Sequence, residues 1–411
     1  MIYLKQGSEK MEYLITDLNH LGQGITRIDN KITFVPKTVS GDIINLEIIK
    51  SHKNYNEAKL LKIVKPSPDR IEYKCPYYNK CGGCNIANLE YTNQLKYKKE
   101  KVINIFKKYN KIDINPTIIA SDEILHYRNK ITLQYNEKLG LYEEKTHNII
   151  EIQECLLMPQ KVNDIIKLLN KYNYNTSLQK IVIRIINNQV MINIIAKDIP
   201  KSLIEILKNL DVSVYHNSKY ISGNKVLIET LNNYKFSILP DSFFQINKKQ
   251  TINLYNQIVE YANPQKEDKV LDLYCGVGTI GIYLSKYCKE VLGIEINKSS
   301  IENANINKKL NNVENISFIE ADVSKVLSMK YKADIIIVDP PRSGLDKNTI
   351  ETLIKINPKK IVYVSCDPIT LSRDINLLKN NYILKDIKLY DMFPETYHVE
   401  SVAMMVIKDN L

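Results

Sequence analysis

The chain has 411 residues, of which 44% are hydrophobic and 25% charged, and this ordinary composition excludes a disordered chain, a collagen and a disulfide scaffold. At about 100 to 200 residues per domain, the length indicates two to four domains. The net charge is +11, and residues 1–110 hold most of the basic excess, which favours a polyanionic partner such as nucleic acid over a merely lysine-rich composition.

Residues 1–66 contain short apolar runs at 13–15, 24–28, 32–35 and 43–49, separated by Gly, Asn and Asp. This spacing predicts the strands of a small OB-like β-barrel. Residues 22–42 resemble the TRAM domain, and the resemblance implies RNA binding. Residues 1–5 lack the apolar core of a signal peptide and no apolar run reaches the roughly 18 residues of a membrane span, so we expect a cytoplasmic protein without a membrane partner.

A central α+β domain is predicted for residues 67–239. It begins after a Pro-rich linker at 65–68 and contains a compact cysteine-rich segment at 75–84. A lysine-rich helix is expected at 91–108, and residues 91–115 could pack on the C-terminal domain. Further helices are expected at 162–169 and 201–210 and strands at 180–186 and 190–195.

The third predicted domain, residues 240–411, alternates apolar strands with helical segments, which is typical of a doubly wound, Rossmann-like sheet. We expect strands at 270–274, 290–295, 334–339 and 360–365. Each ends in a polar residue, and ligands bind at the carboxyl edge of such sheets.

The segment 272–278 (DLYCGVG) is a glycine-rich turn between a strand and a helix. The third glycine of the dinucleotide fingerprint is displaced and a Walker lysine is absent, so neither a dinucleotide nor an NTP is well supported. Glu295, at the end of the next strand, is placed to hold a pair of ribose hydroxyls. The two features resemble those of S-adenosylmethionine (SAM) methyltransferases; alternatively, they are a turn and a helix-capping acid.

The segment 339–344 (DPPRSG) follows an apolar strand, and its two prolines stiffen the loop that presents the Asp339 carboxylate. Methyltransferases acting on exocyclic nitrogen carry a related loop with an aromatic fourth residue. Arg342 stands at that position here, which disfavours N-methylation.

Cys366 follows the next apolar strand, in the segment 365–368 (SCDP), at the same predicted sheet edge. An exposed thiol there could be a nucleophile, whereas a buried cysteine would be inert. Carbon 5 of uracil is too weakly nucleophilic to take a methyl group unaided, and addition of a thiolate to carbon 6 overcomes this. Glu400 is our candidate for the base that then removes the carbon 5 proton.

Together with 244–247 (FQIN) and 398–400 (HVE), these segments resemble, in order and spacing, the RNA uracil-5 (m5U) methyltransferase family. The resemblance implies a SAM-dependent enzyme with Cys366 as nucleophile and Glu400 as proton acceptor. It further implies contacts to SAM or uracil from four residues, Gln245, Tyr274, Glu295 and Asp339. Weaker candidates are Thr279 and Asp322 for SAM, and Arg373 for lowering the thiol pKa, with a plain surface role for Arg373 as the alternative.

The seven cysteines do not suit a secreted disulfide framework, so we expect them as ligands, nucleophiles or core residues. Four of them, Cys75, Cys81, Cys84 and Cys155, could hold zinc or an iron-sulfur cluster. Their spacing is similar to that of family members with a 4Fe-4S cluster, and zinc or unligated thiols are the alternatives. Cys275 and Cys288 are expected to be packing residues.

The resemblance implies structured RNA as the partner, most often 23S rRNA of the large subunit, for a monomeric enzyme. Three alternatives remain: a tRNA m5U methyltransferase, an exocyclic N-methyltransferase, and an RNA-binding protein with a degenerate transferase domain. Because the basic excess lies in the N-terminal part, we expect Lys96, Lys98 and Lys99 to contribute to RNA binding.

Overall fold

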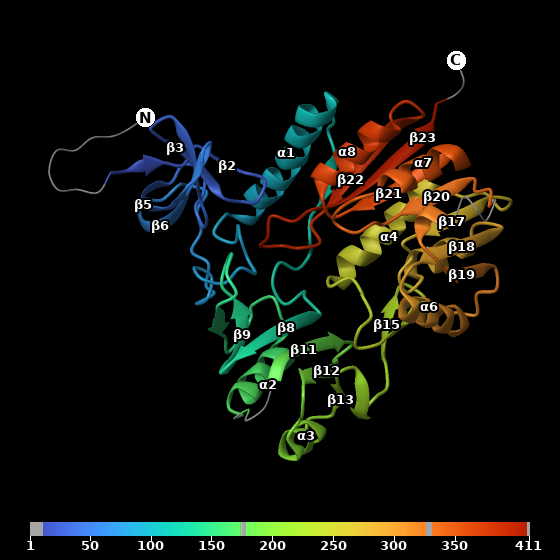
Figure 1. Ribbon diagram of the computed structural model, residues 1–411, viewed down its shortest axis with the longest axis horizontal. Coiled ribbons are helices and arrows are strands. Elements are labelled where there is room, and N and C mark those ends of the chain that lie inside the picture. The colour runs from blue at the N-terminus through green and yellow to red at the C-terminus, as the bar shows by residue number, and fades with distance from the viewer. Residues whose placement is uncertain (1–10, 173, 175–177, 326–330, 409–411) are drawn as a thin grey trace. The chain divides into compact units, whose positions relative to one another are not determined.

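The computed structural model describes residues 11–172, 174, 178–325 and 331–408. The chain forms two compact units (Figure 1). Unit 1 comprises Met1–Asn104, Leu141–Ile150 and Phe393–His398, and unit 2 comprises Ile105–Gly140, Glu151–Met392 and Val399–Leu411. The predicted domain limits, 1–66, 67–239 and 240–411, stay a prediction. Residues 1–5, which were expected not to form a signal peptide, lie outside the described residues.

Unit 1 begins with a six-stranded sheet of order β1-β5-β6-β4-β3-β2. Buried and partly buried positions alternate along the second half of β4, which is the period expected of a strand with one face on a core. The core contains Tyr13, Ile15, Val35, Ile44 and Ala58. The strands are β1 (Tyr13–Leu14), β2 (Asp17–Leu18), β3 (Gly24–Ile28), β4 (Lys31–Val35), β5 (Ile43–Ser51) and β6 (Tyr55–Lys65).

The predicted lysine-rich helix is α1 (Tyr91–Asn110). Its buried residues in unit 1 include Gln94, Lys98, Lys101 and Val102. These positions recur every three or four residues and therefore lie on one face of the helix. Two lysines thus belong to the buried face of a helix that the sequence alone would place at the surface.

Unit 2 contains most of a seven-stranded sheet of order β10-β9-β8-β11-β12-β13-β14, with a separate hairpin of β15 and β16. The central strands β11 and β12 are mostly apolar and mostly buried. The strands are β8 (Lys130–Asn136), β9 (Lys138–Tyr142), β10 (Ile149–Glu151), β11 (Leu178–Ile186), β12 (Gln189–Ala196), β13 (Val212–His216), β14 (Lys219–Ser222), β15 (Leu227–Leu231) and β16 (Tyr234–Ile238). The helices of this region are α2 (Gln160–Asn170) and α3 (Lys201–Lys208).

An eight-stranded sheet of order β19-β18-β17-β20-β21-β23-β22-β7 carries the predicted transferase motifs. The first five strands of this order are parallel, whereas β23 runs antiparallel between β21 and β22. The expected doubly wound arrangement therefore holds for β17 to β21, with an antiparallel insertion. The strands are β7 (Thr117–Ile119), β17 (Lys269–Leu273), β18 (Glu290–Glu295), β19 (Ile316–Glu320), β20 (Ile335–Val338), β21 (Lys360–Ser365), β22 (Tyr382–Tyr390) and β23 (Glu400–Ile407).

Five helices accompany the eight-stranded sheet: α4 (Lys248–Ala262), α5 (Thr279–Ser285), α6 (Lys298–Leu310), α7 (Lys347–Ile356) and α8 (Pro368–Leu378). They form two groups, because α5 packs on α4 and α6 while α7 packs on α8. Both α4 and α8 contact β21, as expected of a sheet covered on both faces. The apolar β20 and the buried part of β21 form the centre of this core.

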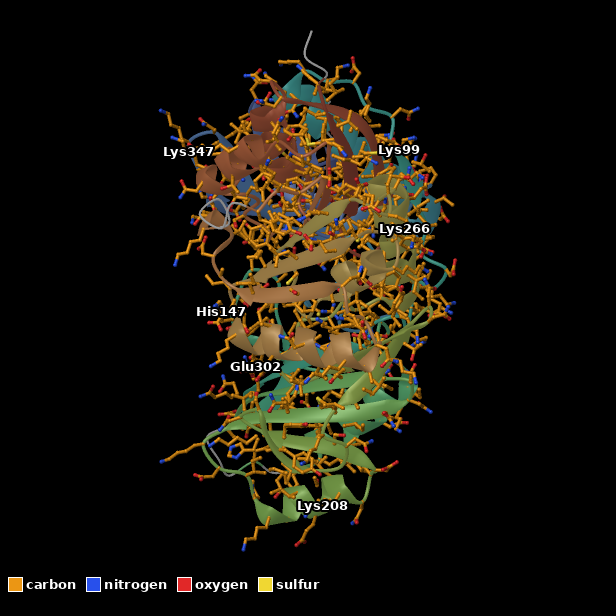
Figure 2. All side chains as sticks on the ribbon, turned by 90° about the vertical axis from the view of Figure 1, so that its right-hand side faces the viewer. Lys99, His147, Lys208, Lys266, Glu302 and Lys347 are labelled. Carbon is orange, nitrogen blue, oxygen red and sulfur yellow. The ribbon has the colours of Figure 1, made fainter. Side chains whose placement is uncertain are left out.

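Charged side chains cover the surface of the helices, and Figure 2 shows Lys208 on α3 and Glu302 on α6 at such exposed positions. Among the described residues, no helix is long and apolar enough to cross a membrane.

Candidate active site

The glycine-rich loop that follows β17 leaves part of its backbone uncovered. Tyr274 and Gly276 both adopt a positive φ, of 62° and 53°. A Cβ atom added to Gly276 would meet nothing within 4 Å, whereas one added to Gly278 would lie 2.4 Å from the ring of Phe318. Gly276 therefore leaves room for close approach of a ligand, and Gly278 is required for packing.

Glu295 ends β18 and faces the same loop. Its carboxylate accepts hydrogen bonds from the backbone amides of Gly276, at 3.2 Å, and Asn297, at 2.8 Å. The second contact has the character of a helix-start interaction, because Asn297 caps α6. Glu295 thus joins the glycine loop to the start of α6, and a carboxylate with two amide contacts still has acceptor sites for ligand hydroxyls.

Three further predicted SAM residues lie around the loop in different settings. The Tyr274 hydroxyl is 3.3 Å from Oγ1 of Thr349, and burial raises the pKa of this phenol. Thr279 is buried, with its hydroxyl 2.9 Å from that of Tyr255. The Asp322 carboxylate accepts two hydrogen bonds from Ser324, which lower its pKa.

Gln245 lies before α4, in a segment fixed by its backbone. Its carbonyl accepts a hydrogen bond of 3.0 Å from the Asn129 side chain, and Asn247 caps α4 through Gln250. Phe243, two residues earlier, is 70% exposed. Sequence reasoning did not single out Phe243, because the sequence shows only an aromatic residue two positions before Gln245 and its exposure is seen only in the structure.

The strand register brings three of the predicted residues to one sheet edge. Val338 at the end of β20 pairs with Tyr363 of β21, so that Asp339 follows β20 close to where β21 ends. Ser365 at the end of β21 pairs with Ser401 at the start of the antiparallel β23. The residues next to this pair are Cys366 and Glu400, which therefore share the edge at which Asp339 lies.

Charges at this edge act on one another. Burial raises the pKa of the Cys366 thiol to about 12, with a further contribution from Glu400, while Arg342 lowers it. Burial also raises the pKa of the Asp339 carboxyl to about 7. Glu400 is 3% exposed, and burial followed by the charge of Asp339 holds its pKa well above its usual range.

Arg342 and Arg373 have roles that the sequence did not separate. Arg342 is the cation that lowers the pKa of both Cys366 and Glu400. Arg373 forms a 2.7 Å ion pair with Asp374. The guanidinium of Arg373 is directed to its own helix and the loop beside it, and an effect of Arg373 on the thiol pKa stays a prediction.

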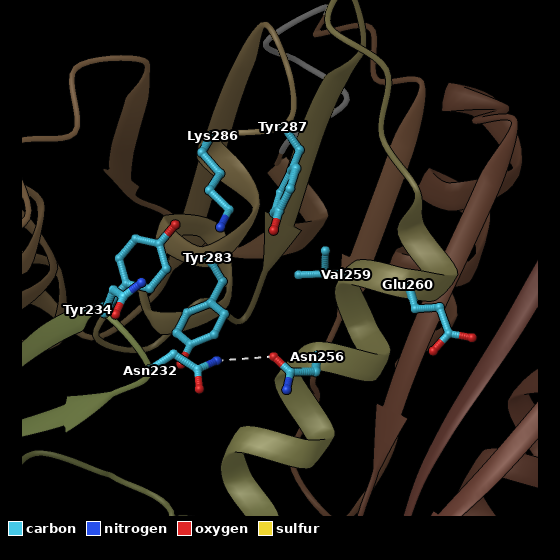
Figure 3. Close-up of a pocket in the computed structure, with 9 residues that line it drawn as sticks. Asn232, Tyr234, Asn256, Val259, Glu260, Tyr283, Lys286 and Tyr287 are labelled. Atoms are coloured by element: carbon cyan, nitrogen blue, oxygen red, sulfur yellow. Dashed lines mark hydrogen bonds between the residues drawn. The ribbon is translucent and has the colours of Figure 1, made fainter.

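A pocket of about 270 Å³ in unit 2 lies among side chains other than the predicted site residues (Figure 3). Figure 3 shows Lys286 near Tyr234 and Tyr287, and its Nζ lies 5.9 Å and 4.6 Å from their ring centres. The pocket opens beside the end of α5, whereas the glycine loop precedes the start of that helix. It is separate from the edge that carries Cys366. The lining residues are Asn232, Asn233, Tyr234, Asn256, Val259, Glu260, Tyr283, Lys286 and Tyr287.

The predicted metal ligands are divided between the units: Cys75, Cys81 and Cys84 lie in unit 1 and Cys155 in unit 2. The backbone amide of Gly83 donates a hydrogen bond of 3.3 Å to Sγ of Cys81. Across residues 11–172, 174, 178–325 and 331–408, no group of three or more His, Cys, Asp or Glu side chains is arranged to hold a metal ion. Cys275 and Cys288 are buried, as expected of packing residues.

The three lysines expected to bind RNA differ in accessibility. Lys96 is exposed and Lys99 partly exposed, but Lys98 is fully buried and donates a hydrogen bond of 3.0 Å to the carbonyl of Phe393. Lys101 makes a similar bond of 2.5 Å to the carbonyl of Tyr397. The prediction is wrong for Lys98, because its ammonium group holds a backbone carbonyl instead of facing solvent.

Comparison with known proteins identifies two families. The pattern of the tRNA (uracil-5-)-methyltransferase family matches residues 90–408, and that of the TRAM domain matches residues 6–61. Two relatives named uncharacterised RNA methyltransferases come from Clostridium tetani, with 35% identity over 95% of each chain, and Staphylococcus aureus, with 36% identity over 96% of this chain and 97% of the relative.

A solved structure is similar over nearly the whole chain. It is the tRNA (uracil-54, C5)-methyltransferase of Pyrococcus abyssi in complex with S-adenosyl-L-homocysteine. It has 29% sequence identity and a TM-score of 0.79, covering 96% of this chain and 100% of that chain. The arrangement of the eight-stranded sheet is thus similar to that of an enzyme whose crystals contain the demethylated product of SAM.

Proposed function

The chain belongs to the tRNA (uracil-5-)-methyltransferase family and is a SAM-dependent RNA methyltransferase acting on uracil carbon 5, and from this premise we propose the residues that carry the reaction and its RNA target. Cys366 is the nucleophile and Glu400 the base. The observation that carries this proposal is the pairing of Ser365 with Ser401, which supports a shared edge for the two residues. The TRAM domain supports binding of RNA outside the transferase part.

The reaction begins with the Cys366 thiolate, whose sulfur forms a bond to carbon 6 of the uracil. The electron pair of the carbon 5–carbon 6 double bond moves into an enolate, which makes carbon 5 nucleophilic. SAM, when bound, would supply an electrophilic methyl group on a sulfonium; carbon 5 takes that group, and the electron pair of the broken sulfur–methyl bond stays on the sulfur as a neutral thioether. Glu400 then accepts the proton of carbon 5, and the returning electron pair expels the thiolate.

The electrostatics of the edge act on these two roles in opposite directions. The cation of Arg342 opposes the burial that raises the pKa of Cys366, and it therefore favours the thiolate. A carboxylate such as Glu400, with a pKa above its usual range, has a higher affinity for a proton than an exposed one. The same low-dielectric edge thus disfavours free thiolate and strengthens the base.

The SAM site is assigned to Gln245, Tyr274, Glu295 and Asp339, with Thr279 and Asp322 as further contacts. The open space over Gly276 supports this assignment, because a cofactor can approach the backbone there. Glu295 would hold the ribose hydroxyls, and the partly buried Asp339 carboxylate would attract a positively charged ligand.

The target we propose is a uridine of 23S rRNA, because the family resemblance links the combination of a TRAM domain and the cysteine segment with large-subunit rRNA. tRNA is the second candidate, and the similarity to the Pyrococcus abyssi tRNA methyltransferase favours it. A flipped-out uridine in structured RNA would be accessible to Cys366 in either case. We propose that the protein acts as a monomer.

The test compares nucleosides of rRNA and tRNA from wild-type cells, a deletion strain, and deletion strains carrying the wild-type or the Cys366→Ala protein. Mass spectrometry should show loss of 5-methyluridine at one or more rRNA positions, restored only by the wild type. Loss of 5-methyluridine from tRNA alone would show that the target is tRNA and not rRNA. A Cys366→Ala protein that restores the methyl group, or a methyl group found on nitrogen, would overturn the mechanism.

We propose that four cysteines, Cys75, Cys81, Cys84 and Cys155, hold a 4Fe-4S cluster. Because methyl transfer needs no electron, the function of this cluster is structural. Three thiols between residues 75 and 84 and the Gly83 amide directed at Cys81 support such a site. The test measures iron, acid-labile sulfide and zinc in protein purified without oxygen, beside a Cys81→Ser variant. Equal iron and sulfide, lost in the variant, are expected; zinc or no metal would refute the cluster.

A further inference from the structure

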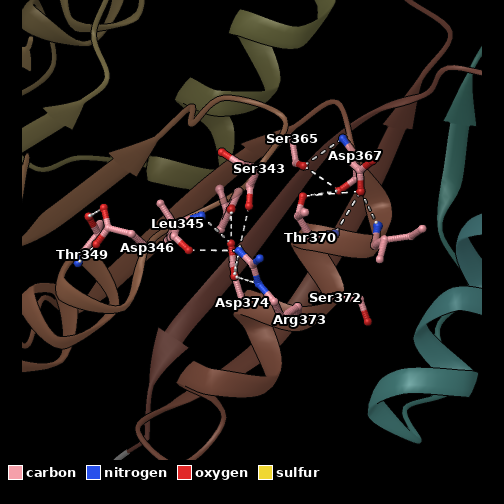
Figure 4. Close-up of polar contacts among 12 residues, drawn as sticks. Ser343, Leu345, Asp346, Thr349, Ser365, Asp367, Thr370, Ser372, Arg373 and Asp374 are labelled. Carbon is pink, nitrogen blue, oxygen red and sulfur yellow. Dashed lines mark hydrogen bonds and ion pairs between the residues drawn. The ribbon is translucent and has the colours of Figure 1, made fainter.

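The loop after Asp339 is fastened to α8 through its backbone (Figure 4). Nη2 of Arg373 donates hydrogen bonds to the carbonyls of Ser343, at 2.9 Å, and Leu345, at 3.0 Å. The amide of Leu345 in turn donates to Oδ2 of Asp374 at 2.8 Å. Two adjacent residues of α8 therefore fix both backbone groups of Leu345 and one of Ser343.

The rest of this loop is held equally closely. Oγ1 of Thr370, in the first turn of α8, donates to the carbonyl of Arg342 at 3.2 Å. Gly344 has a φ of 73°, and a Cβ atom there would lie 2.6 Å from both the Arg373 guanidinium and the Asp374 carboxylate. A side chain at Gly344 would therefore collide with the ion pair, so all four residues of 342–345 are fitted to α8.

Asp374 is the buried anchor of this arrangement. Its carboxylate is fully buried, and it accepts hydrogen bonds from the Tyr363 hydroxyl, at 2.6 Å, and from Nε of Arg373, at 2.7 Å. A buried charge needs such partners, because loss of one leaves the other groups without compensation. Tyr363 lies on β21, so Asp374 connects α8 to the strand that leads to Cys366.

The same helix begins immediately after Cys366. Asp367 caps α8 by accepting hydrogen bonds from the amides of Ile369 and Thr370, at 2.9 Å and 3.0 Å. Cys366 is therefore joined to α8 at its start, while the loop that carries Arg342 is joined to the next turn. The relative position of the thiol and the guanidinium depends on a helix segment of about two turns.

We propose that Arg373 and Asp374 are positioning residues for the reaction, which hold the loop 342–345 on α8 and thereby keep the guanidinium of Arg342 beside the Cys366 thiol. This inference rests on the proposed function, in which Cys366 is the nucleophile. It separates the charge of Arg373, which is used in its pair with Asp374, from its planar fork, in which Nε is directed at Asp374 while Nη2 donates to both carbonyls. Lysine can replace the charge but not the fork.

The test measures the rate of covalent adduct formation with RNA containing 5-fluorouridine, together with kcat, the KM for RNA and the SAM affinity. Arg373→Gln and Arg373→Lys should both slow adduct formation about tenfold, because small displacements of reacting groups are costly. The Kd for SAM should stay within about twofold of wild type. The lysine variant should recover most of the melting temperature, because it keeps the ion pair, without recovering the rate.

The adduct rate should also shift in its pH profile, since a displaced Arg342 favours the thiolate less; the Arg373 variants then need higher pH for the same rate. Tyr363→Phe removes the 2.6 Å hydrogen bond from Tyr363 to Asp374. Its matched control is Tyr261→Phe, because Tyr261 donates an equally short hydrogen bond of 2.6 Å to Asp386. The control should keep the wild-type rate. Arg373 has a side chain that is 48% exposed, so its variants should fold even if Asp374→Asn does not.

Adduct rates within about twofold of wild type in both Arg373 variants would overturn the inference. Full recovery of the adduct rate in Arg373→Lys would overturn the role of the fork. A loss of SAM affinity equal to the loss of rate would show that Arg373 and Asp374 contribute only to the general stability of the domain. Failure of the wild type to form any adduct would instead refute the nucleophilic role of Cys366, which distinguishes the two proposals.

Discussion

The carboxylate of Glu295 accepts a hydrogen bond of 3.2 Å from the backbone amide of Gly276. One side chain thus connects the end of β18 to the open glycine of the loop after β17. The contact is structural, and the same carboxylate is our candidate for the ribose hydroxyls. A substitution that keeps the amide contact but removes the charge can separate the two roles.

Glu295→Gln should raise the Kd for SAM about tenfold, because a neutral amide binds a hydroxyl pair less strongly than a carboxylate does. The melting temperature should fall modestly, since the single amide oxygen of glutamine can still accept from Gly276 but the NH2 group cannot accept from Asn297. Calorimetry measures the Kd for SAM, and a thermal scan measures the melting temperature. Glu302→Gln, an exposed carboxylate on α6 seen in Figure 2, is the control. Unchanged SAM affinity in the Glu295 variant would exclude the ribose role.

Glu400→Gln should stop the reaction after methyl transfer, because the carbon 5 proton then has no acceptor. We expect kcat to fall by about 100-fold or more, the usual contribution of a general base. With SAM and ordinary RNA, the variant should accumulate a covalent protein–RNA species on denaturing gels, and Glu400→Gln combined with Cys366→Ala should not. If the Glu400→Gln variant turned over at the wild-type rate and accumulated no covalent species, a group other than Glu400 would be the acceptor of the carbon 5 proton.

Much of the site could be predicted from the sequence because it follows the ends of apolar strands. The position of Cys366 after β21 needed only the period of the strand and the turn that follows. The antiparallel direction of β23, which brings Glu400 to the same edge, could not be predicted, because strand order depends on contacts distant in sequence. The different roles of Gly276 and Gly278 likewise depend on Phe318, which lies about 40 residues later.

The charged residues were the least predictable, because composition places lysine and arginine at the surface and only packing shows otherwise. Lys98 is buried against the carbonyl of Phe393, and Arg373 is committed to Asp374 and a loop. The partner of Lys98 lies almost 300 residues later in the sequence. The partners of Arg373 lie about 30 residues earlier and on the same helix turn, and no local sequence pattern distinguishes such buried or paired residues from exposed ones. Arg342, by contrast, was visible as an unusual residue in its loop.

Lys96 and Lys99 should contribute to RNA binding, whereas Lys98 should contribute to stability. Replacing the first two by alanine should reduce the slope of log K against log salt by about 1 to 2, as expected when two phosphate contacts are lost. Lys98→Met should leave that slope unchanged and lower the free energy of unfolding by about 1 to 3 kcal/mol, because a buried carbonyl loses its donor. Fluorescence anisotropy and denaturant unfolding measure the two effects, and SAM affinity should remain that of the wild type. A reduced salt slope for Lys98→Met would contradict its burial.

The raised pKa of Cys366 predicts how its reactivity depends on pH. With a pKa of about 12, the thiolate is a small fraction at neutral pH and grows about tenfold for each pH unit, so alkylation by iodoacetamide should rise in the same proportion between about pH 7 and pH 9. Arg342→Gln should slow alkylation a few-fold at any pH in this range, because loss of the cation raises the thiol pKa further, although solvent screens part of the effect. Peptide mass spectrometry resolves Cys366 from the other cysteines, and Lys347→Gln removes an exposed cation of α7 as the control. A rate that levels off below pH 8 would show that the pKa of the Cys366 thiol in the free protein lies below that pH, and would contradict the pKa of about 12.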